Sequence, residues 1–254
     1  MGQLNRNNGL GKEVLAFILV PAGHAGANKE LLHNLELPYQ AVTSTDLYLT
    51  HYLNDSANDP VMNRIRAQKL RNSEEDKVKI FFVPSYLNGD DGVLNMPYYD
   101  LLVGMDLTAF PSYYEPWGYT PLESLAFKVP TITTTLAGFG LWVKEHYNMN
   151  HPGIEVIHRE DGDASNVATA IAEWVKNYTQ VGETEMQKDR DNAKDVSRIA
   201  LWDNLINYYK QAYTIALNQV SVRLKDLPAN MNESVSYIEK QLTVNNPSWV
   251  SVMI

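Results

Sequence analysis

The chain has 254 residues, no cysteine, and 21 basic against 30 acidic side chains, which give a net charge of −9. The absence of cysteine excludes disulfides, thiolate zinc sites and cysteine nucleophiles, and the acidic balance argues against a general nucleic-acid partner. The longest apolar run, Val14 to Val20, is too short to span a bilayer, so no membrane segment is expected. A cysteine-free chain without a visible signal peptide fits a cytoplasmic location.

The first third of the sequence predicts two strands separated by helices. Val14–Pro21 (VLAFILVP) is a continuous apolar run ended by proline, typical of a strand buried on both faces. Ala27–Leu35 and Pro60–Arg71 have helical character, and the second opens with proline at the first helical position. Val78–Pro84 (VKIFFVP) is a second buried strand, and a turn-rich loop follows it at residues 88–92.

The rest of the sequence continues this alternation. Helices are expected over Tyr98–Gly104, Thr120–Phe127, Ser165–Tyr178 and, with a break, Glu183–Leu217; strands are expected over Leu107–Pro111, Thr131–Leu136 and Glu155–His158. Apolar strands that alternate with helices predict an α/β fold, a Rossmann-like parallel sheet with helices on both faces. We expect residues 1–219 to form this lobe and residues 220–254 to form a C-terminal tail, with one helix near Val235–Leu242.

The segment richest in chemical signals is Phe110–Gly140 (FPSYYEPWGYTPLESLAFKVPTITTTLAGFG). Within it, Thr120-Pro121-Leu122-Glu123 reads as a helix start, with Thr120 as the N-cap and Glu123 as its capping-box partner. This predicts a strand, a loop and a helix N-terminus at the carboxyl end of a parallel strand, where open α/β sheets bind ligands. The free N–H groups of such a helix would hold a phosphate, and Gly118 would allow close approach.

An interpretation without any ligand also fits these residues. Glu123 could simply cap its helix, Glu115 could be a solvated loop carboxylate, and Trp117 could be part of the core. Capping boxes are common and need no ligand.

The segment SYYEPWGYTPLES closely resembles the signature of glycogen synthases of the animal and fungal type, with Glu115 and Glu123 as the paired glutamates of the family's E-x7-E motif. The resemblance runs from about Ala16 to Leu217 and includes AFILVPA, KIFFVPSYL, TTTLAGFG and SRIALWDNLINYYKQAYTIAL. These enzymes are retaining glycosyltransferases of the two-lobed GT-B architecture. The resemblance therefore implies the C-terminal, donor-binding lobe of an enzyme that transfers glucose from a nucleotide sugar to the non-reducing end of an α-1,4-glucan.

The resemblance also implies a role for each residue of the motif. Glu115, the catalytic residue, would contact the hydroxyls of the transferred glucose near the reacting carbon. The run from Trp117 through Gly118 and Tyr119 to Thr120 would line the sugar and the diphosphate, partly through backbone amides.

Residues on either side of that run would complete the donor site. Glu123 would accept hydrogen bonds from the ribose hydroxyls, Tyr98 would stack on the base, and Tyr86 would help enclose it; both tyrosines could instead serve packing. Gly138 and Gly140 would form a turn near the sugar, or a plain turn at a strand end. UDP-glucose is favoured as donor, and ADP-glucose stays open because stacking discriminates poorly between bases.

Parts of the family pattern are missing from this sequence. The family's Arg and Lys in a GRYE-type motif are absent, and so is the N-terminal lobe that carries the acceptor site. We therefore expect a fragment that binds the donor without turning it over. Its partners would be the missing lobe and the glucan, and a homo-oligomer stays open. The alternatives are another retaining GT-B enzyme with a different acceptor and a non-catalytic module that binds sugar nucleotides.

No metal site and no cofactor beyond the substrate is expected. Asp161-Gly162-Asp163 resembles a D-x-D metal motif but precedes a helix, which favours a turn and an N-cap. The six histidines show no H-x-x-x-H spacing. An aromatic stripe near the end, from Trp202 through Tyr208 and Tyr209 to Tyr213, is expected to pack against the other lobe and to be partly exposed without it.

Overall fold

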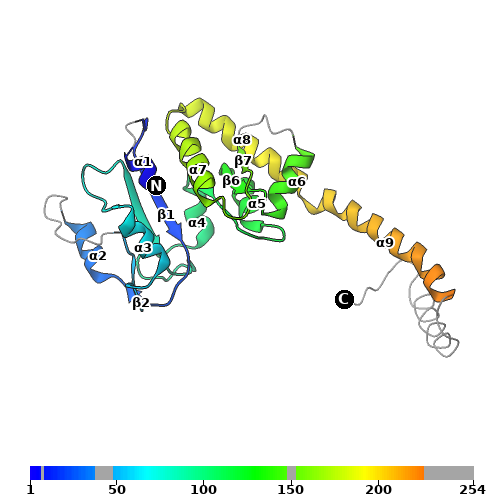
Figure 1. The fold of residues 1–254 in the computed structure, drawn as a ribbon, viewed down its shortest axis with the longest axis horizontal. Helices are drawn as coiled ribbons and strands as arrows, with labels where there is room; N and C mark the ends of the chain where they lie inside the picture. Colours follow the sequence, from blue (N-terminus) through cyan, green and yellow to red (C-terminus); the bar gives the residue numbers. More distant parts are fainter. Residues whose placement is uncertain (7–8, 38–47, 148–152, 226–254) are drawn as a thin grey trace. The chain divides into compact units, whose positions relative to one another are not determined.

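The structure is a computed structural model that describes residues 1–6, 9–37, 48–147 and 153–225. Its contacts divide the chain into two units, Met1–Arg198 and the residues from Ile199 onward. The first unit contains all the described strands, and the described part of the second consists mainly of one long helix (Figure 1).

The first third of the chain forms three short helices and four strands. These are α1 (Gly2–Arg6), β1 (Val14–Leu19), β2 (His24–Ala27), α2 (Lys29–Glu36), β3 (His51–Leu53), α3 (Pro60–Ala67) and β4 (Val78–Val83). The predicted strands and helices are confirmed. Side-chain caps mark the starts of α2 and α3. The Asn28 side chain accepts hydrogen bonds from the N–H groups of Glu30 and Leu31, and the Asp59 side chain accepts one from the N–H group of Met62. Strands β2 and β3 are short and carry no periodic signal, so the sequence did not predict them.

The remaining elements follow the predicted order. They are α4 (Tyr98–Val103), β5 (Thr108–Ala109), α5 (Tyr119–Ala126), β6 (Thr131–Thr134), α6 (Gly138–His146), β7 (Ile154–Ile157), α7 (Ala164–Tyr178), α8 (Glu183–Ile199) and α9 (Trp202–Lys225). The expected break in the long terminal helix lies between α8 and α9. Helix α6 was not predicted, because its first turn reads as a glycine turn.

Parallel pairing confirms the α/β class. Strand β1 pairs in parallel with β4, and β5, β6 and β7 form a parallel three-stranded sheet. The hydrogen bonds of the described strands thus divide them between separate sheets instead of one continuous sheet, and β2 and β3 add an antiparallel pair. Helices α5, α6 and α7 lie around β6 and β7 (Figure 1).

Strand β1 is less buried than its sequence predicts. Leu15 is 55% exposed and Leu19 37%, so the expectation of burial on both faces is wrong. An apolar run shows that a strand can be buried, whereas the elements that pack on each face decide whether it is. Here β1 pairs with β4 and with no other described strand.

A hydrophobic core nevertheless joins both parallel sheets of the first unit. Most of its buried members come from α3, β4, β6, β7 and α7, and they include Met62, Ile65, Val78, Ile80, Phe82, Ile132, Ile157, Val167 and Val175. This core fixes the strands, so that the loops at their carboxyl ends have defined positions.

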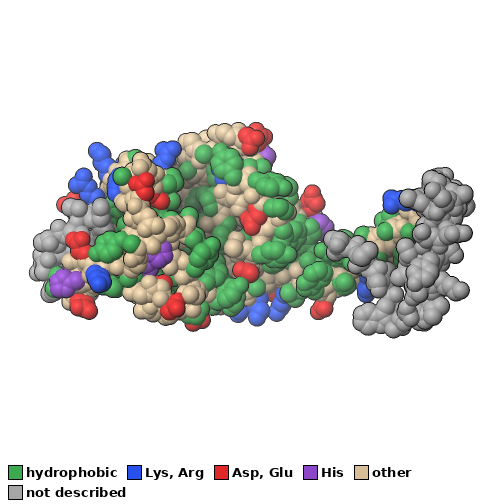
Figure 2. All heavy atoms as spheres, turned by 90° about the horizontal axis from the view of Figure 1, so that it is seen from below, with side chains coloured by type: hydrophobic (Ala, Val, Ile, Leu, Met, Phe, Trp, Pro, Cys, Tyr) green, Lys and Arg blue, Asp and Glu red, His purple; other side chains and the backbone are tan. Residues whose placement is uncertain are grey.

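Helix α9 extends past Leu217, where the sequence predicted the helical stretch to end, and continues through Lys225. The rest of the predicted tail, with the expected helix near Val235–Leu242, lies outside the described residues. Trp202, Tyr209 and Tyr213 are exposed, and hydrophobic side chains reach the surface along α9 (Figure 2). No helix within the described ranges has both the length and the apolar character needed to cross a membrane.

Candidate functional site

The loop that carries Glu115 runs from β5 to α5 and is bonded to the segment that follows β6. The Glu115 N–H donates to the Leu136 carbonyl (3.1 Å), and the Glu115 carbonyl accepts from the Gly138 N–H (3.0 Å). The Trp117 carbonyl accepts from the Phe139 N–H at 2.6 Å. These bonds hold the loop along the first turn of α6, at the carboxyl end of the three-stranded sheet.

Both predicted glycines in this region are needed for close packing. A Cβ atom on Gly138 would lie 2.1 Å from the Pro116 carbonyl oxygen, and one on Gly140 would lie 2.3 Å from that of Thr134. The expectation of a glycine turn at this place is wrong, because the two residues form the first turn of α6. They let the helix approach the Glu115 loop and β6.

Helix α5 begins two residues earlier than the sequence predicts. Its N-cap is Gly118, with φ of +103°, and its first residue is Tyr119, so the predicted capping box of Thr120 and Glu123 does not form. The positive φ of Gly118 turns the chain directly into the helix, which a residue with a side chain would resist. No side chain caps either α5 or α6.

Because Glu123 does not cap its helix, its carboxylate acts elsewhere. The negative charge of Glu123 raises the pKa of the Tyr99 phenol. Burial of the phenol and its hydrogen bond to the Glu123 carboxylate act in the same direction, with smaller effects. Burial, and then the charge of Glu123, raises the pKa of Tyr98. The charge of Glu123 on α5 thus acts on both tyrosines at the start of α4, one of which, Tyr98, is a predicted donor-binding residue.

The carboxylate of Glu115 lies beside Gly118. It is half-buried, and its Oε2 accepts from the Ser112 hydroxyl at 3.0 Å. A Cβ on Gly118 would lie 3.4 Å from the same oxygen. This glutamate is therefore held by its own loop and is not a freely solvated carboxylate.

The aromatic and polar residues that follow Glu115 differ in their surroundings. The ring of Trp117 packs on α6, with its centroid 5.7 Å from that of Phe139 and 5.7 Å from that of Trp142. Tyr119 is 68% exposed, and Thr120 is half-buried. Trp117 thus has a packing role whatever else it contacts, while Tyr119 remains accessible.

A cavity of about 520 Å³ opens at the carboxyl ends of β1 and β4. It is lined by residues 21–24, 84–86, 88, 90 and 91. Among the predicted site residues only Tyr86 lines it, with 77% of its surface exposed. The cavity and the Glu115 loop are therefore different places in the structure, and the sequence predicted only the second in detail.

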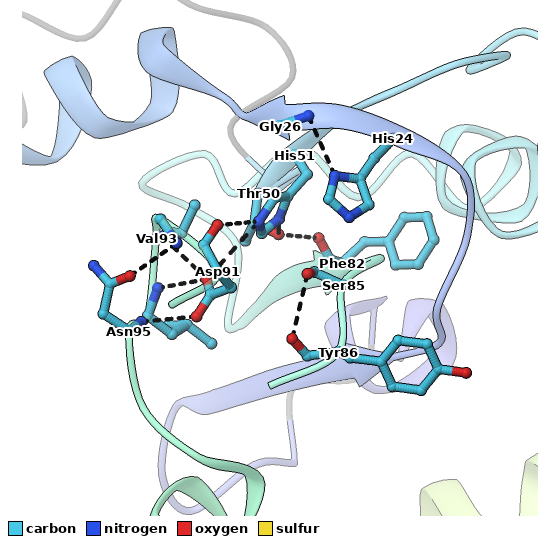
Figure 3. A network of polar contacts seen from close by, with 12 residues as sticks. His24, Gly26, Thr50, His51, Phe82, Ser85, Tyr86, Asp91, Val93 and Asn95 are labelled. Atoms are coloured by element: carbon cyan, nitrogen blue, oxygen red, sulfur yellow. Dashed lines mark hydrogen bonds and ion pairs between the residues drawn. The ribbon is translucent and has the colours of Figure 1, made fainter. Parts of the chain in front are cut away.

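A buried polar network forms the back of this cavity (Figure 3). His51 is fully buried; its Nε2 lies 2.8 Å from the Asp91 carbonyl oxygen, and its Nδ1 lies 2.9 Å from the Thr50 hydroxyl. The His24 ring packs on His51 with centroids 4.7 Å apart. These contacts tie the loop after β4 to β3, and sequence reasoning missed them because no motif links residues 24, 51 and 91.

The Asp91 carboxylate stabilises the same loop. Burial acts to raise its pKa, but the N–H groups of Leu94, Val93 and Asn95, with the nearby His51, outweigh burial, and the pKa is lowered. Asp91 is therefore a structural anion, and its neighbour Asp90 lines the cavity.

Sequence reasoning also missed Arg159, which follows β7. Its side chain is buried and donates to carbonyl groups of the Glu115 loop. The available signal was a basic residue directly after the predicted strand Glu155–His158, at the sheet edge where the other site loops lie.

The described residues contain no group of three or more His, Asp or Glu side chains that could hold a metal ion. Asp161 and Asp163 precede α7, as the sequence predicted. Asp163 occupies the N-cap position, but its side chain makes no capping hydrogen bond.

Comparison with known proteins gives consistent sequence matches. The model of the family described as glycogen synthase matches residues 8–252. Glycogen [starch] synthase isoform 1 of Saccharomyces cerevisiae is 31% identical over 174 residues, which are 67% of this chain and 25% of the yeast protein. The Caenorhabditis elegans glycogen [starch] synthase is 32% identical over 195 residues, 76% of this chain and 28% of the worm protein. The matched segment thus spans about a quarter of the length of these relatives.

Among solved structures, HepE of Anabaena in complex with UDP-glucose aligns with 81% of this chain and 49% of its own. The sequence identity is 16% and the TM-score 0.40.

Proposed function

Because the chain belongs to the glycogen synthase family, we propose that it is the donor-binding part of an enzyme that transfers glucose from a nucleotide sugar to the non-reducing end of an α-1,4-glucan. The observation that supports this most directly is the Glu115 loop, which is bonded to the start of α6 at the carboxyl end of the β5–β6–β7 sheet, the edge where open α/β sheets bind ligands. In this proposal Tyr98 and Glu123 serve the nucleoside: the ring stacks on the base, and the carboxylate accepts hydrogen bonds from ribose hydroxyls. Glu123 does not cap its own helix.

The diphosphate in this proposal lies near the starts of α5 and α6. Neither helix has a side-chain cap, and their N-termini carry partial positive charge that favours an anion. When the bond between the anomeric carbon and the diphosphate oxygen breaks, negative charge grows on the diphosphate. Backbone N–H groups fixed in advance stabilise that charge without reorganisation.

Glu115 would contact the glucose hydroxyls near the reacting carbon, since it is held beside Gly118. In the retaining mechanism implied by the resemblance, the acceptor attacks on the face that the diphosphate leaves, and the diphosphate assists removal of the acceptor proton. Gly118, Gly138 and Gly140 allow the close backbone packing that such a site requires. Tyr119 and Thr120 would line the sugar and diphosphate.

UDP-glucose is the donor that we propose, with ADP-glucose as the alternative. The cavity beside Tyr86 offers room to enclose a base. The acceptor glucan, an upstream acceptor lobe, a possible homo-oligomer and a cytoplasmic location complete the proposal. Fractionation of the host cells and sedimentation of the whole enzyme would test the last two.

The first test is a titration of the chain with UDP, ADP and UDP-glucose, followed by tryptophan fluorescence because Trp117 lies in the Glu115 loop. Glu123→Gln should weaken UDP binding by about 1.5–3 kcal/mol, the cost of a lost charge-assisted hydrogen bond, which is roughly ten- to hundredfold in Kd. Glu75→Gln, at an exposed loop position, is the matched control and should bind as the wild type does. No saturable response to any nucleotide, or equal Kd values for both variants, would contradict the proposal.

A further inference from the structure

Arg159 connects the loops that follow all three strands of the β5–β6–β7 sheet. Its Nη1 donates to the Pro111 carbonyl at 2.6 Å and to the Ser112 carbonyl at 3.3 Å. Its backbone N–H donates to the Thr135 hydroxyl (2.9 Å), and that hydroxyl donates back to the Arg159 carbonyl (3.3 Å). A single residue after β7 thus holds the backbone after β5 and after β6.

The charge of Arg159 is buried without an anion. The residue is only 6% exposed, and no described carboxylate lies within ion-pair distance of it. Its guanidinium carbon instead lies 3.9 Å from the centroid of the Tyr113 ring, a cation–π contact. Nε, also buried, has no hydrogen-bond partner among the described residues. Burying a cation is costly unless hydrogen bonds or other charge contacts compensate it, and here two carbonyl groups and the Tyr113 ring do so.

Arg159 fixes the position of the segment that leads to Glu115. The Ser112 carbonyl accepts from Arg159 and also from the Thr134 hydroxyl at 2.9 Å. The Ser112 side chain then donates to Glu115 Oε2 at 3.0 Å. The path from Arg159 through Ser112 to Glu115 is therefore continuous.

We propose that Arg159 is a positioning residue that holds the Ser112–Glu115 segment in the geometry in which Glu115 meets the transferred sugar. It does not touch the donor itself. The inference rests on the proposed function for the identity of the ligand, but the fixed position of the loop is a property of the unliganded chain. The proposal predicts that loss of the Arg159 side chain weakens the binding of UDP-glucose, whose glucosyl group meets Glu115, and hardly changes the binding of UDP.

The binding test compares UDP-glucose with UDP in Arg159→Met, Arg159→Lys and the wild type. In Arg159→Met, UDP-glucose affinity should fall roughly ten- to hundredfold, as for a displaced contact group, while the Kd of UDP changes less than about twofold. Arg159→Lys keeps the charge and a nitrogen donor but loses the planar guanidinium that lies over the Tyr113 ring, so it should restore part of the loss. Arg64→Met, at an exposed position of α3, is the matched control and should change neither affinity. Equal weakening of both ligands, or no weakening, would overturn the inference.

Amide hydrogen exchange of the unliganded chain is the second measurement. In Arg159→Met the N–H groups of Glu115 and Gly138 should exchange at least about tenfold faster, with little change in the β1–β4 sheet. If the wild type binds no nucleotide, the proposed function fails, whereas this exchange comparison still decides the role of Arg159. If Arg159→Met does not fold, Thr134→Val removes the other anchor of Ser112 and should give the same two results. Exchange at wild-type rates in a folded variant would overturn the inference.

Discussion

Gly138 shows at the scale of one residue how the Glu115 loop is held. Its N–H donates to the Glu115 carbonyl, and the space where a Cβ would lie is occupied by the Pro116 carbonyl oxygen, 2.1 Å away. No side chain can shift to relieve that contact because the neighbouring atom belongs to the backbone. Gly138 is therefore required for the loop and the helix to approach each other this closely.

Gly138→Ala should lower the free energy of unfolding by about 1–3 kcal/mol, the usual cost of overpacking, as measured by urea denaturation. The added methyl group must push α6 away from the Glu115 loop, so UDP-glucose binding should weaken as well.

Gly104→Ala provides the comparison for Gly138→Ala. Gly104 has φ of −83°, and a Cβ there would meet the Leu101 carbonyl oxygen at 3.4 Å, an ordinary contact. This variant should keep or slightly raise stability. Equal stability of the two variants would show that the loop can move away from α6 at little cost.

At the scale of elements, α7 and α8 carry an unusual buried pair. The Tyr178 hydroxyl and Asp189 Oδ1 are both buried without hydrogen-bond partners among the described residues. Burial, together with the negative charge of Asp189, raises the pKa of the Tyr178 phenol to about 12. Burial and the neighbouring Glu185 likewise raise the pKa of Asp189. Each group therefore keeps its proton to a higher pH in the folded chain than in the unfolded chain.

Stability should fall as the pH rises from about 10 toward 12. In the unfolded chain the phenol titrates near pH 10, so above this pH the unfolded state loses a proton that the folded state retains. The stability that the raised pKa contributes is complete below pH 10 and is lost as the pH passes the folded value. Urea denaturation at a series of pH values measures this slope.

Tyr178→Phe should reduce the slope and leave stability near pH 7 unchanged or slightly higher, because the lost hydroxyl makes no hydrogen bond. Tyr52→Phe, at an exposed site, should keep the wild-type slope. If stability fell with pH as steeply in Tyr178→Phe as in the wild type, groups other than Tyr178 would cause the loss of stability at alkaline pH.

At the scale of the whole molecule, the matched segment spans 25% of the length of the yeast relative. Helix α9 exposes aromatic side chains, including Trp202, Tyr209 and Tyr213. In the function that we propose, the donor-binding part acts together with an acceptor lobe.

The 254-residue chain should therefore bind UDP-glucose without transferring glucose to glycogen. Release of UDP in the presence of glycogen measures transfer, and the fluorescence titration on the same sample establishes binding. The same chain joined to an acceptor lobe and the GRYE-type motif of a relative serves as the positive control. Sustained glucosyl transfer by the 254 residues alone would refute this prediction.

The order of strands and helices could be predicted because it depends on local patterns. Apolar runs such as Val14–Leu19 and Val78–Val83 indicate strands, and Asn28, Asp59 and Pro60 mark helix starts through bonds to their own neighbours. The pairing of β2 with β3 and the exposure of β1 could not be predicted, because both depend on elements distant in the sequence.

The candidate site, like the fold, could be predicted from the sequence only in part. The sequence by itself determined the α/β fold class, the family, and the segment from Phe110 to Gly140 as the place of the paired glutamates. Only the tertiary structure decided that α5 starts at Tyr119, that the Glu115 loop is bonded to the start of α6, and that a buried Arg159 holds this loop. The physical reason is that apolar runs and capping signals act over a few residues, so the sequence suggests them directly, whereas the start of α5 is set by the backbone at Gly118 and the predicted capping box does not form. The positive φ of Gly118 and the reach of Arg159 to the Pro111 carbonyl depend on how the β5–β6–β7 sheet brings distant backbone together.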